Sequence, residues 1–111
     1  MEIPFEIASR FTEGTLLAAI AQDVTNGEVL MLAWMNAQAL QQTLSTRRVT
    51  YWSRSRNSLW VKGESSGNTQ ELMSIRYDCD SDALLMQVHQ LGGACHTGER
   101  SCFFSEIALD D

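Results

Sequence analysis

The chain has 111 residues and a net charge of −6, and 44% of its residues are hydrophobic. We expect a single domain over residues 1–111, because domains are commonest at roughly 100–150 residues and this hydrophobic fraction can build a core. The acidic balance excludes a general nucleic-acid binder, since such proteins carry a basic surface. The N-terminal residues lack the basic and apolar regions of a signal peptide. The longest apolar run, Val29 to Met35, is far shorter than the ~20 residues of a membrane span. We therefore expect a soluble cytoplasmic protein that binds no membrane.

The first predicted elements are two strands within Thr15 to Met35. Two apolar runs flank Asn26-Gly27, a dipeptide that tolerates the positive φ angles of a tight type I′ turn, so the pattern predicts an N-terminal β-hairpin. The second run is apolar on both faces, which is typical of a central strand covered on both sides.

One main helix is predicted next, over the segment NAQALQQTLSTR. Asn36 is a candidate N-cap. Ala37, Leu40 and Leu44 form one apolar stripe at helical spacing, so we expect this face to pack on the sheet.

After Arg48 the apolar period changes to two, which predicts strands. The segments are VTYWSRSR, LWVKG, QELMSIRYD and ALLMQVHQ, with a turn at Asn57-Ser58 and a polar loop at Gly63–Asn68. Strands outnumber helices. The predicted fold class is therefore α+β, with a strand-rich mixed sheet, an N-terminal β-hairpin and one main helix.

Three aspartates alternate with Cys79 and Ser81 in the stretch from Asp78 to Asp82. If a strand continued from Leu72 through Asp82, its carboxylates would share one face, about 7 Å apart in successive pairs, and Cys79 would face the other side. Carboxylates this close repel one another unless a cation intervenes. Their oxygens suit Mg²⁺ or Ca²⁺, whereas a thiol suits Zn²⁺. The stretch therefore indicates two different metals.

This acidic stretch has two alternative interpretations. An EF-hand loop is excluded, because Ala83 stands where that loop requires glycine and His89 where it requires glutamate. An exposed acidic turn that binds no ion remains possible for the aspartates alone.

The three cysteines, Cys79, Cys95 and Cys102, all lie in the last third of the chain. An odd number leaves one thiol over in a closed disulfide framework. Their spacing matches neither zinc fingers nor the cytidine-type deaminases. Three cysteines without a fourth protein ligand would leave an open position, as in catalytic zinc sites, where bound water has a pKa of about 7. For any single cysteine, a buried structural role is the alternative.

His96 follows Cys95 directly and lies in a polar segment, so it is a candidate proton shuttle and the candidate catalytic residue. His89 lies on a predicted strand, where a structural role is the simpler interpretation.

Five of the eight basic residues lie between Arg47 and Lys62, next to the Gly/Ser loop. Arginine forks bind phosphate in two places at once, and backbone N–H groups of such a loop can hold an oxyanion. Trp52 and Trp60 could stack on a base, although a solvated strand face and core tryptophans are the simpler alternatives. The candidate substrate-binding residues are Arg54, Arg56, Trp60, Lys62, Ser65 and Ser66. Together these signals indicate a small phosphate-bearing substrate near a hydrolytic zinc.

Four segments resemble, in order and spacing, the phosphoribosyl-AMP cyclohydrolases of histidine biosynthesis: NGEVLMLAWMN, YWSRSRNSLWVKGESSG, IRYDCDSDALL and GGACHTGERSCFF. The resemblance covers roughly Leu16 to Phe104. Three departures are mild: Ser65 stands where threonine is expected, Arg47-Arg48 where glycine is usual, and Ala18 where proline is frequent. None of them is a candidate ligand.

The resemblance implies a hydrolase that opens the adenine ring of phosphoribosyl-AMP between N1 and C6, giving the formimino-carboxamide ribonucleotide. It implies an intertwined homodimer that shares a zinc site. The ligands it implies are Cys79, Cys95 and Cys102 for zinc and Asp78, Asp80 and Asp82 for magnesium. Two other classes stay open: a zinc-stabilised, non-catalytic nucleotide-binding module and a nucleotide deaminase, which would release ammonia.

Overall fold

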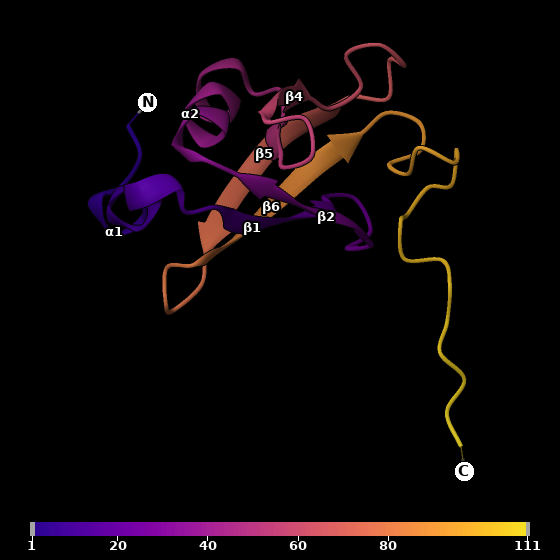
Figure 1. Cartoon of the computed structure of the whole chain (residues 1–111). Helices are drawn as coiled ribbons and strands as arrows, with labels where there is room; N and C mark the ends of the chain where they lie inside the picture. Colours follow the sequence, from indigo (N-terminus) through magenta and orange to yellow (C-terminus); the bar gives the residue numbers. More distant parts are fainter. Residues whose placement is uncertain (1, 111) are drawn as a thin grey trace.

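The computed structural model describes residues 2–110 of the chain (Figure 1). In chain order its elements are α1 (Phe5–Ala8), a 3₁₀ helix η1 (Ser9–Gly14), β1 (Leu17–Asp23), β2 (Val29–Met35), α2 (Ala37–Thr46), β3 (Thr50–Ser53), β4 (Ser58–Val61), β5 (Gln70–Tyr77) and β6 (Ala83–Gln90). This arrangement confirms the predicted α+β class. Within residues 2–110, no helix has the length and hydropathy needed to cross a membrane.

The main sheet has four strands in the order β2-β1-β6-β5, and β3 and β4 form a separate two-stranded sheet. The central strands β1 and β6 run parallel, from Ala18 opposite Ala83 to Asp23 opposite Val88, while both outer pairs are antiparallel. The sheet is therefore mixed, as predicted. Because β1 and β6 are parallel, the turn after β1 and the segment after β6 lie at the same end of the sheet (Figure 1).

Helix α2 forms as its sequence predicts, with one change in the buried face. The side chain of Asn36 accepts a hydrogen bond from the Ala39 N–H at 2.8 Å, so it is the N-cap. Leu40 and Leu44 are buried, but Ala37 is exposed. Buried Thr43 completes the face instead: its hydroxyl donates to the Ala39 carbonyl and accepts from the Thr50 N–H at 2.9 Å, which joins α2 to β3.

Two predictions about the hairpin of β1 and β2 are wrong. The strands pair antiparallel, but the Asp23 N–H donates to the Glu28 carbonyl at 2.7 Å, so four residues form the loop. Gly27 has a φ of 78° while Asn26 has no positive φ, which excludes a type I′ turn. Strand β2 is an edge strand of the sheet rather than a central one, and Val29 is 44% exposed.

The expected strand through Asp82 is also wrong, because β5 ends at Tyr77. The carboxylate of Asp78 accepts hydrogen bonds from the Asp82 N–H at 2.9 Å and the Ala83 N–H at 3.2 Å. Ser81 takes a left-handed φ of 58°. These features form a tight turn, so strand alternation does not set the spacing of the aspartates or the direction of Cys79.

Strand β3 is likewise shorter than predicted and ends at Ser53. The Ser53 hydroxyl accepts from the Arg56 N–H at 3.2 Å, and Asn57 has a φ of 52°, so residues 54–57 form a turn. Arg54 and Arg56 therefore lie on this turn and not on a strand face.

We expect Asn36→Ala to lower the free energy of unfolding by about 1 kcal/mol, because the cap of the Ala39 N–H is lost. Chemical denaturation of both proteins measures this difference. Gln38→Ala, an exposed site on the same helix, is the control and should change stability little. Equal losses in the two variants would contradict the capping role.

Candidate functional site

Cys95 and Cys102 meet in a compact loop that follows β6. Within this loop the Cys95 N–H donates to the Glu99 carbonyl at 3.1 Å, and the Cys102 N–H donates to the Leu30 carbonyl of β2 at 2.7 Å. A Cβ atom at Gly93 would lie 2.6 Å from the Gly98 carbonyl oxygen, so the close return of the loop needs glycine there. The loop brings the two thiols close enough for each to influence the pKa of the other.

The surroundings of these thiols favour the thiolate at one of them. The Thr97 hydroxyl donates to Cys95 Sγ at 3.1 Å, and this bond lowers the pKa of Cys95. Burial, together with the neighbouring Cys95, raises the pKa of Cys102. The pair therefore releases its first proton readily from Cys95, and a thiolate is the form that binds metal.

Lys62 is the cation nearest to this pair. It is 8% exposed, and its ammonium donates to the Ala94 carbonyl at 2.6 Å. Burial lowers the pKa of Lys62, while the nearby Cys102 and Cys95 oppose that shift. In turn, the charge of Lys62 favours the thiolate forms of both cysteines. Lys62 thus faces the thiols and the loop backbone.

A cavity of about 480 Å³ opens beside Cys95. Its walls bring together seven of the residues predicted from the sequence: Arg56, Trp60, Lys62, Ser65, Ser66, Cys95 and His96. The side chain of His96 is exposed. The cavity therefore combines a thiol, an imidazole, cations, hydroxyls and an aromatic ring, a combination that can hold and protonate a polar aromatic ligand.

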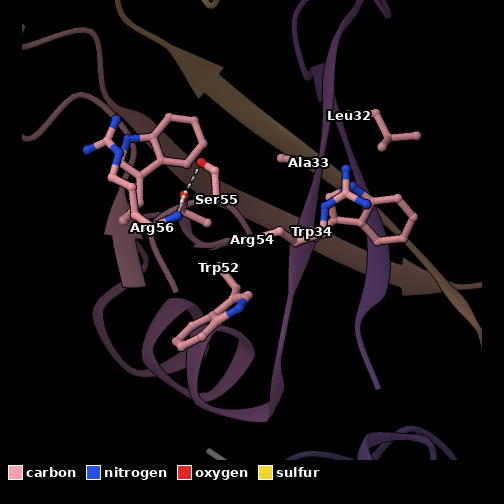
Figure 2. A pocket seen from close by; sticks show the side chains of 9 residues that line it. Leu32, Ala33, Trp34, Trp52, Arg54, Ser55 and Arg56 are labelled. Atoms are coloured by element: carbon pink, nitrogen blue, oxygen red, sulfur yellow. Dashed lines mark hydrogen bonds between the residues drawn. The ribbon is translucent and has the colours of Figure 1, made fainter. Parts of the chain in front are cut away.

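A second hollow of about 660 Å³ adjoins the first, because Arg56 and Trp60 line both. It contains Arg54, whose guanidinium carbon lies 4.8 Å from the centre of the Trp34 ring. Figure 2 shows Arg54 beside Trp34, with Trp52 and Arg56 on other walls of the same hollow. The predicted arginines thus line two hollows that share Arg56 and Trp60 as walls.

A buried polar chain, which the sequence analysis missed, contacts two residues that line the first cavity, Trp60 and Asn68. The Tyr51 hydroxyl donates to Gln70 Oε1 at 2.7 Å, and Gln70 Nε2 donates to Gln90 Oε1 at 2.9 Å. Gln90 then donates to the Leu91 carbonyl at 2.9 Å, just before the cysteine loop. The available signal was glutamine at inward positions of β5 and β6, where a buried polar group needs a partner.

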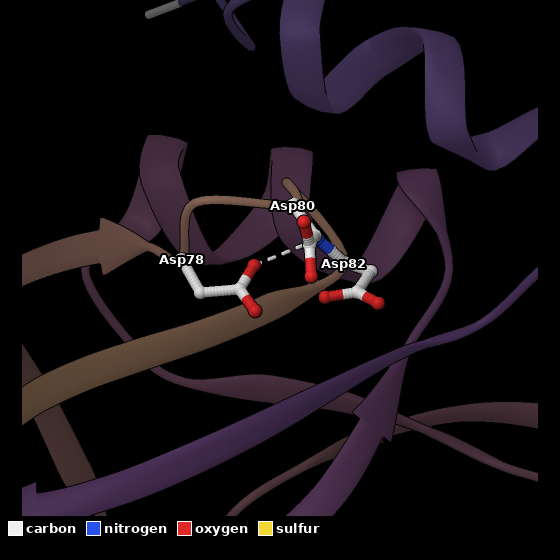
Figure 3. Close-up of side chains that lie close together, drawn as sticks. All are labelled: Asp78, Asp80 and Asp82. Carbon is white, nitrogen blue, oxygen red and sulfur yellow. Dashed lines mark hydrogen bonds between the residues drawn. The ribbon is translucent and has the colours of Figure 1, made fainter.

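The second group of candidate ligands lies in the β5–β6 turn. One carboxylate oxygen from each of Asp78, Asp80 and Asp82 lies within 4.8 Å of the others (Figure 3). Hydrogen bonding from the Asp82 backbone lowers the pKa of Asp78, whereas the hydrogen bond and charge of Asp78 raise that of Asp82. Three carboxylates at this separation fit a hard cation, which would relieve their repulsion.

Arg10 is a further contact of this turn that sequence reasoning missed. Its guanidinium donates to the Asp80 carbonyl at 2.7 Å. The two residues are 70 positions apart, and no local pattern marks such a contact.

Cys79 does not reach the other two cysteines within one chain. It lies in the turn before β6, whereas Cys95 and Cys102 follow the end of this strand of 8 residues. A strand of this length spans ~25 Å. Over residues 2–110, the aspartate group is the only cluster of three or more His, Cys, Asp or Glu ligand atoms within 4.8 Å.

Comparison with known proteins matches residues 31–104 to the family model of phosphoribosyl-AMP cyclohydrolase. A relative of that name from Hyphomonas neptunium is 64% identical over 102 residues, which cover 92% of this chain and 78% of the relative. A second, from Ruegeria pomeroyi, is 58% identical and covers 95% of this chain and 89% of its own length. A third, from Corynebacterium jeikeium, is 57% identical, with 85% and 74% covered. The predicted resemblance is therefore confirmed: the chain belongs to the phosphoribosyl-AMP cyclohydrolase family of hydrolytic enzymes, which act on a cyclic amidine.

Proposed function

We propose that this chain hydrolyses the N1–C6 bond of the adenine ring of phosphoribosyl-AMP, a step of histidine biosynthesis, and that it requires metal ions to do so. The observation that carries the proposal is the cavity beside Cys95, in a chain that belongs to this family. Arg56, Trp60, Lys62 and His96 line that cavity. The reaction adds water oxygen to C6, breaks the N1–C6 bond and leaves a proton on the released nitrogen. No ammonia is formed.

The residues of the cavity account for the needs of this substrate. Trp60 offers an aromatic face for the purine ring. Arg56 would bind one phosphate, and Arg54 in the adjoining hollow would bind the other. Ser65 and Ser66 would donate further hydrogen bonds to the phosphate at Arg56. The two hollows share Arg56 and Trp60 as walls, which suits a ligand with a phosphoribosyl group on each side of its base.

His96 is proposed as the group that moves the proton. It lies on the wall of the cavity next to Cys95 and is exposed to it. In this position the imidazole would take a proton from the attacking water and return it to N1 as the N1–C6 bond breaks.

Zinc is the cofactor that the thiols fit. Cys95 and Cys102 are close enough to influence each other's pKa, Cys95 has a lowered pKa, and thiolates are ligands that zinc prefers. Cys79 from a second copy of the chain would be the third ligand. Zinc bound there lowers the pKa of a bound water to about 7.

Magnesium is proposed for the carboxylates of Asp78, Asp80 and Asp82, whose oxygens form the only such cluster between residues 2 and 110. A hard cation at this turn would also bind phosphate oxygens of the substrate. The two proposed metal sites lie at opposite ends of β6. They would act in one reaction if a dimer brought the start of β6 in one chain next to the end of β6 in the other.

A homodimer is therefore part of the proposal. The ~25 Å length of β6 keeps Cys79 from the other two thiols in one chain. In a two-fold dimer, each end of one chain can meet the opposite end of the other, which gives two equivalent shared sites.

Incubation with phosphoribosyl-AMP tests the function directly. We expect an ultraviolet absorbance change on ring opening, without ammonia, that stops after chelation and returns when zinc is restored. Release of ammonia would instead favour a deaminase. Substrate binding without turnover, with zinc held by four protein ligands, would favour a non-catalytic module.

Replacing His96 with alanine should lower kcat much more than it raises KM, because a proton shuttle acts in the transition state. Loss of a general acid–base group typically costs ~10²–10⁴-fold in rate. His89→Ala is the matched control, since His89 is exposed on β6, and it should keep full activity. A change confined to KM would assign His96 to substrate binding.

Mixing two inactive variants tests the shared zinc site. Cys79→Ser and Cys95→Ser proteins should each lack activity and lose zinc. After the chains are dissociated and reassociated together, a mixed dimer contains one site with all three cysteines. Random reassociation makes about half of the dimers mixed, so roughly a quarter of the wild-type activity should return.

Mixing two preparations of the same variant is the control and should restore nothing. Mixed dimers that form but stay inactive would mean that each chain builds its own zinc site.

A further inference from the structure

We propose that Arg100, anchored by the buried carboxylate of Asp23, is a positioning residue that sets the spacing of the Cys95 and Cys102 thiols. The zinc role of these thiols rests on the proposed function, whereas their spacing can be measured without metal. Neither Arg100 nor Asp23 is a candidate ligand or a wall of the cavity beside Cys95.

The Asp23 carboxylate is the fixed partner of Arg100. Asp23 ends β1, is 3% exposed, and is paired with Val88 of the neighbouring central strand. One of its carboxylate oxygens accepts from the Thr25 N–H at 2.7 Å. The other forms an ion pair with the Arg100 guanidinium. The carboxylate is thus held by rigid backbone at the end of the sheet where the cysteine loop lies.

The guanidinium also makes weaker contacts around Asp23. Its Nε donates to Glu28 Oε1 at 3.2 Å, and its Nη1 lies 3.5 Å from the Gly92 carbonyl oxygen. Glu28 is 40% exposed on its side chain, so this outer pair is screened by water. Asp23 is nearly out of water, and its interaction with Arg100 is the stronger of the two.

Backbone hydrogen bonds connect Arg100 to the two thiols. The Arg100 carbonyl accepts from the Ala94 N–H at 3.0 Å, and Ala94 directly precedes Cys95. On the other side, the Ser101 hydroxyl donates to the Val29 carbonyl at 2.8 Å, and the Cys102 N–H donates to the Leu30 carbonyl. Both thiols therefore flank a segment that the Asp23–Arg100 pair holds against the hairpin.

The consequence is a division of roles within the loop. Thr97 and Lys62 set the charge of the thiols, while Arg100 sets where they lie. Without the ion pair, the loop would keep its internal backbone bonds and the bonds of Ser101 and Cys102 to β2, but it would lose its attachment to the end of β1. The two sulfur atoms would then meet less often at the distance that one metal ion requires.

Asp23→Asn is the sharpest variant, because the amide is isosteric and its oxygen can still accept from the Thr25 N–H. Its NH₂ group then replaces the oxygen that pairs with Arg100, so the ionic attraction and the hydrogen bond to Arg100 are both lost. We expect zinc affinity, measured by competition with a chromophoric chelator, to fall by about 10- to 100-fold. The visible spectrum of bound Co²⁺ should change as well, because it reports the geometry of the thiolate ligands. Arg100→Lys keeps the charge without the fork, so its loss should be smaller.

Glu28→Gln is the matched control, since it removes the exposed arm and leaves the Asp23–Arg100 pair in place. It should bind zinc and Co²⁺ as the unchanged protein does. A lower unfolding temperature in Asp23→Asn, with zinc affinity and the Co²⁺ spectrum unaltered, would overturn the proposal and leave the ion pair a purely stabilising role.

A metal-free measurement separates this proposal from the proposed function. In a Cys79→Ser background, the rate of Cys95–Cys102 disulfide formation under a fixed amount of diamide reports how often the two thiols meet. We expect Asp23→Asn to slow this reaction about tenfold relative to the background protein, an effect on the order of that for supporting groups at metal sites. An unchanged rate would contradict the positioning role even if zinc binding were confirmed. A slower rate would support it even if zinc did not bind.

Discussion

The parallel pairing of β1 with β6 determines at which end of the main sheet each group of candidate metal ligands lies. It places the turn that follows β1 beside the cysteine loop that follows β6, and it leaves the β5–β6 turn at the opposite end. This pairing allows Asp23 to meet Arg100, whereas the length of β6 separates Cys79 from Cys95. The pairing therefore explains how the Cys95–Cys102 loop is supported, and the length of β6 explains why Cys79 lies far from it within one chain.

The polar groups around the thiols are costly to bury, and the fold satisfies them. Within residues 2–110, no buried side-chain nitrogen or oxygen lacks a hydrogen-bond partner. The chain from Tyr51 through Gln70 to Gln90 ends at the backbone just before the loop, and Lys62 reaches the Ala94 carbonyl from β4's end. A polar network of this kind is stable when all its members are paired, and it then makes the structure beneath the cysteine loop rigid.

Local patterns predicted much of the fold, and the failures have physical causes. Asn36 and the spacing of Leu40 and Leu44 identified α2, because capping and helical period are local signals. The aspartates were misplaced on a strand, since alternate carboxylates also suit a turn whose backbone N–H groups bind Asp78. The residues that line the cavity were predicted from their chemical types and their order along the chain. The Arg10–Asp80 and Asp23–Arg100 contacts could not be predicted, because their partners are distant in sequence.

Strand β2 was predicted to be a central strand, because its apolar pattern is that of a strand covered on both sides. In the structure it lies at the edge of the sheet. Val29 and Leu32 are each 44% exposed on this edge, and the C-terminal segment that leaves it exposes Phe103, Phe104, Ile107 and Leu109. Figure 1 shows that segment extending away from the sheet. The Leu30 carbonyl, which holds Cys102, lies on the same edge. A second copy placed here would bury this apolar surface next to the thiol pair, so the burial that drives association would also exclude water from the proposed zinc site.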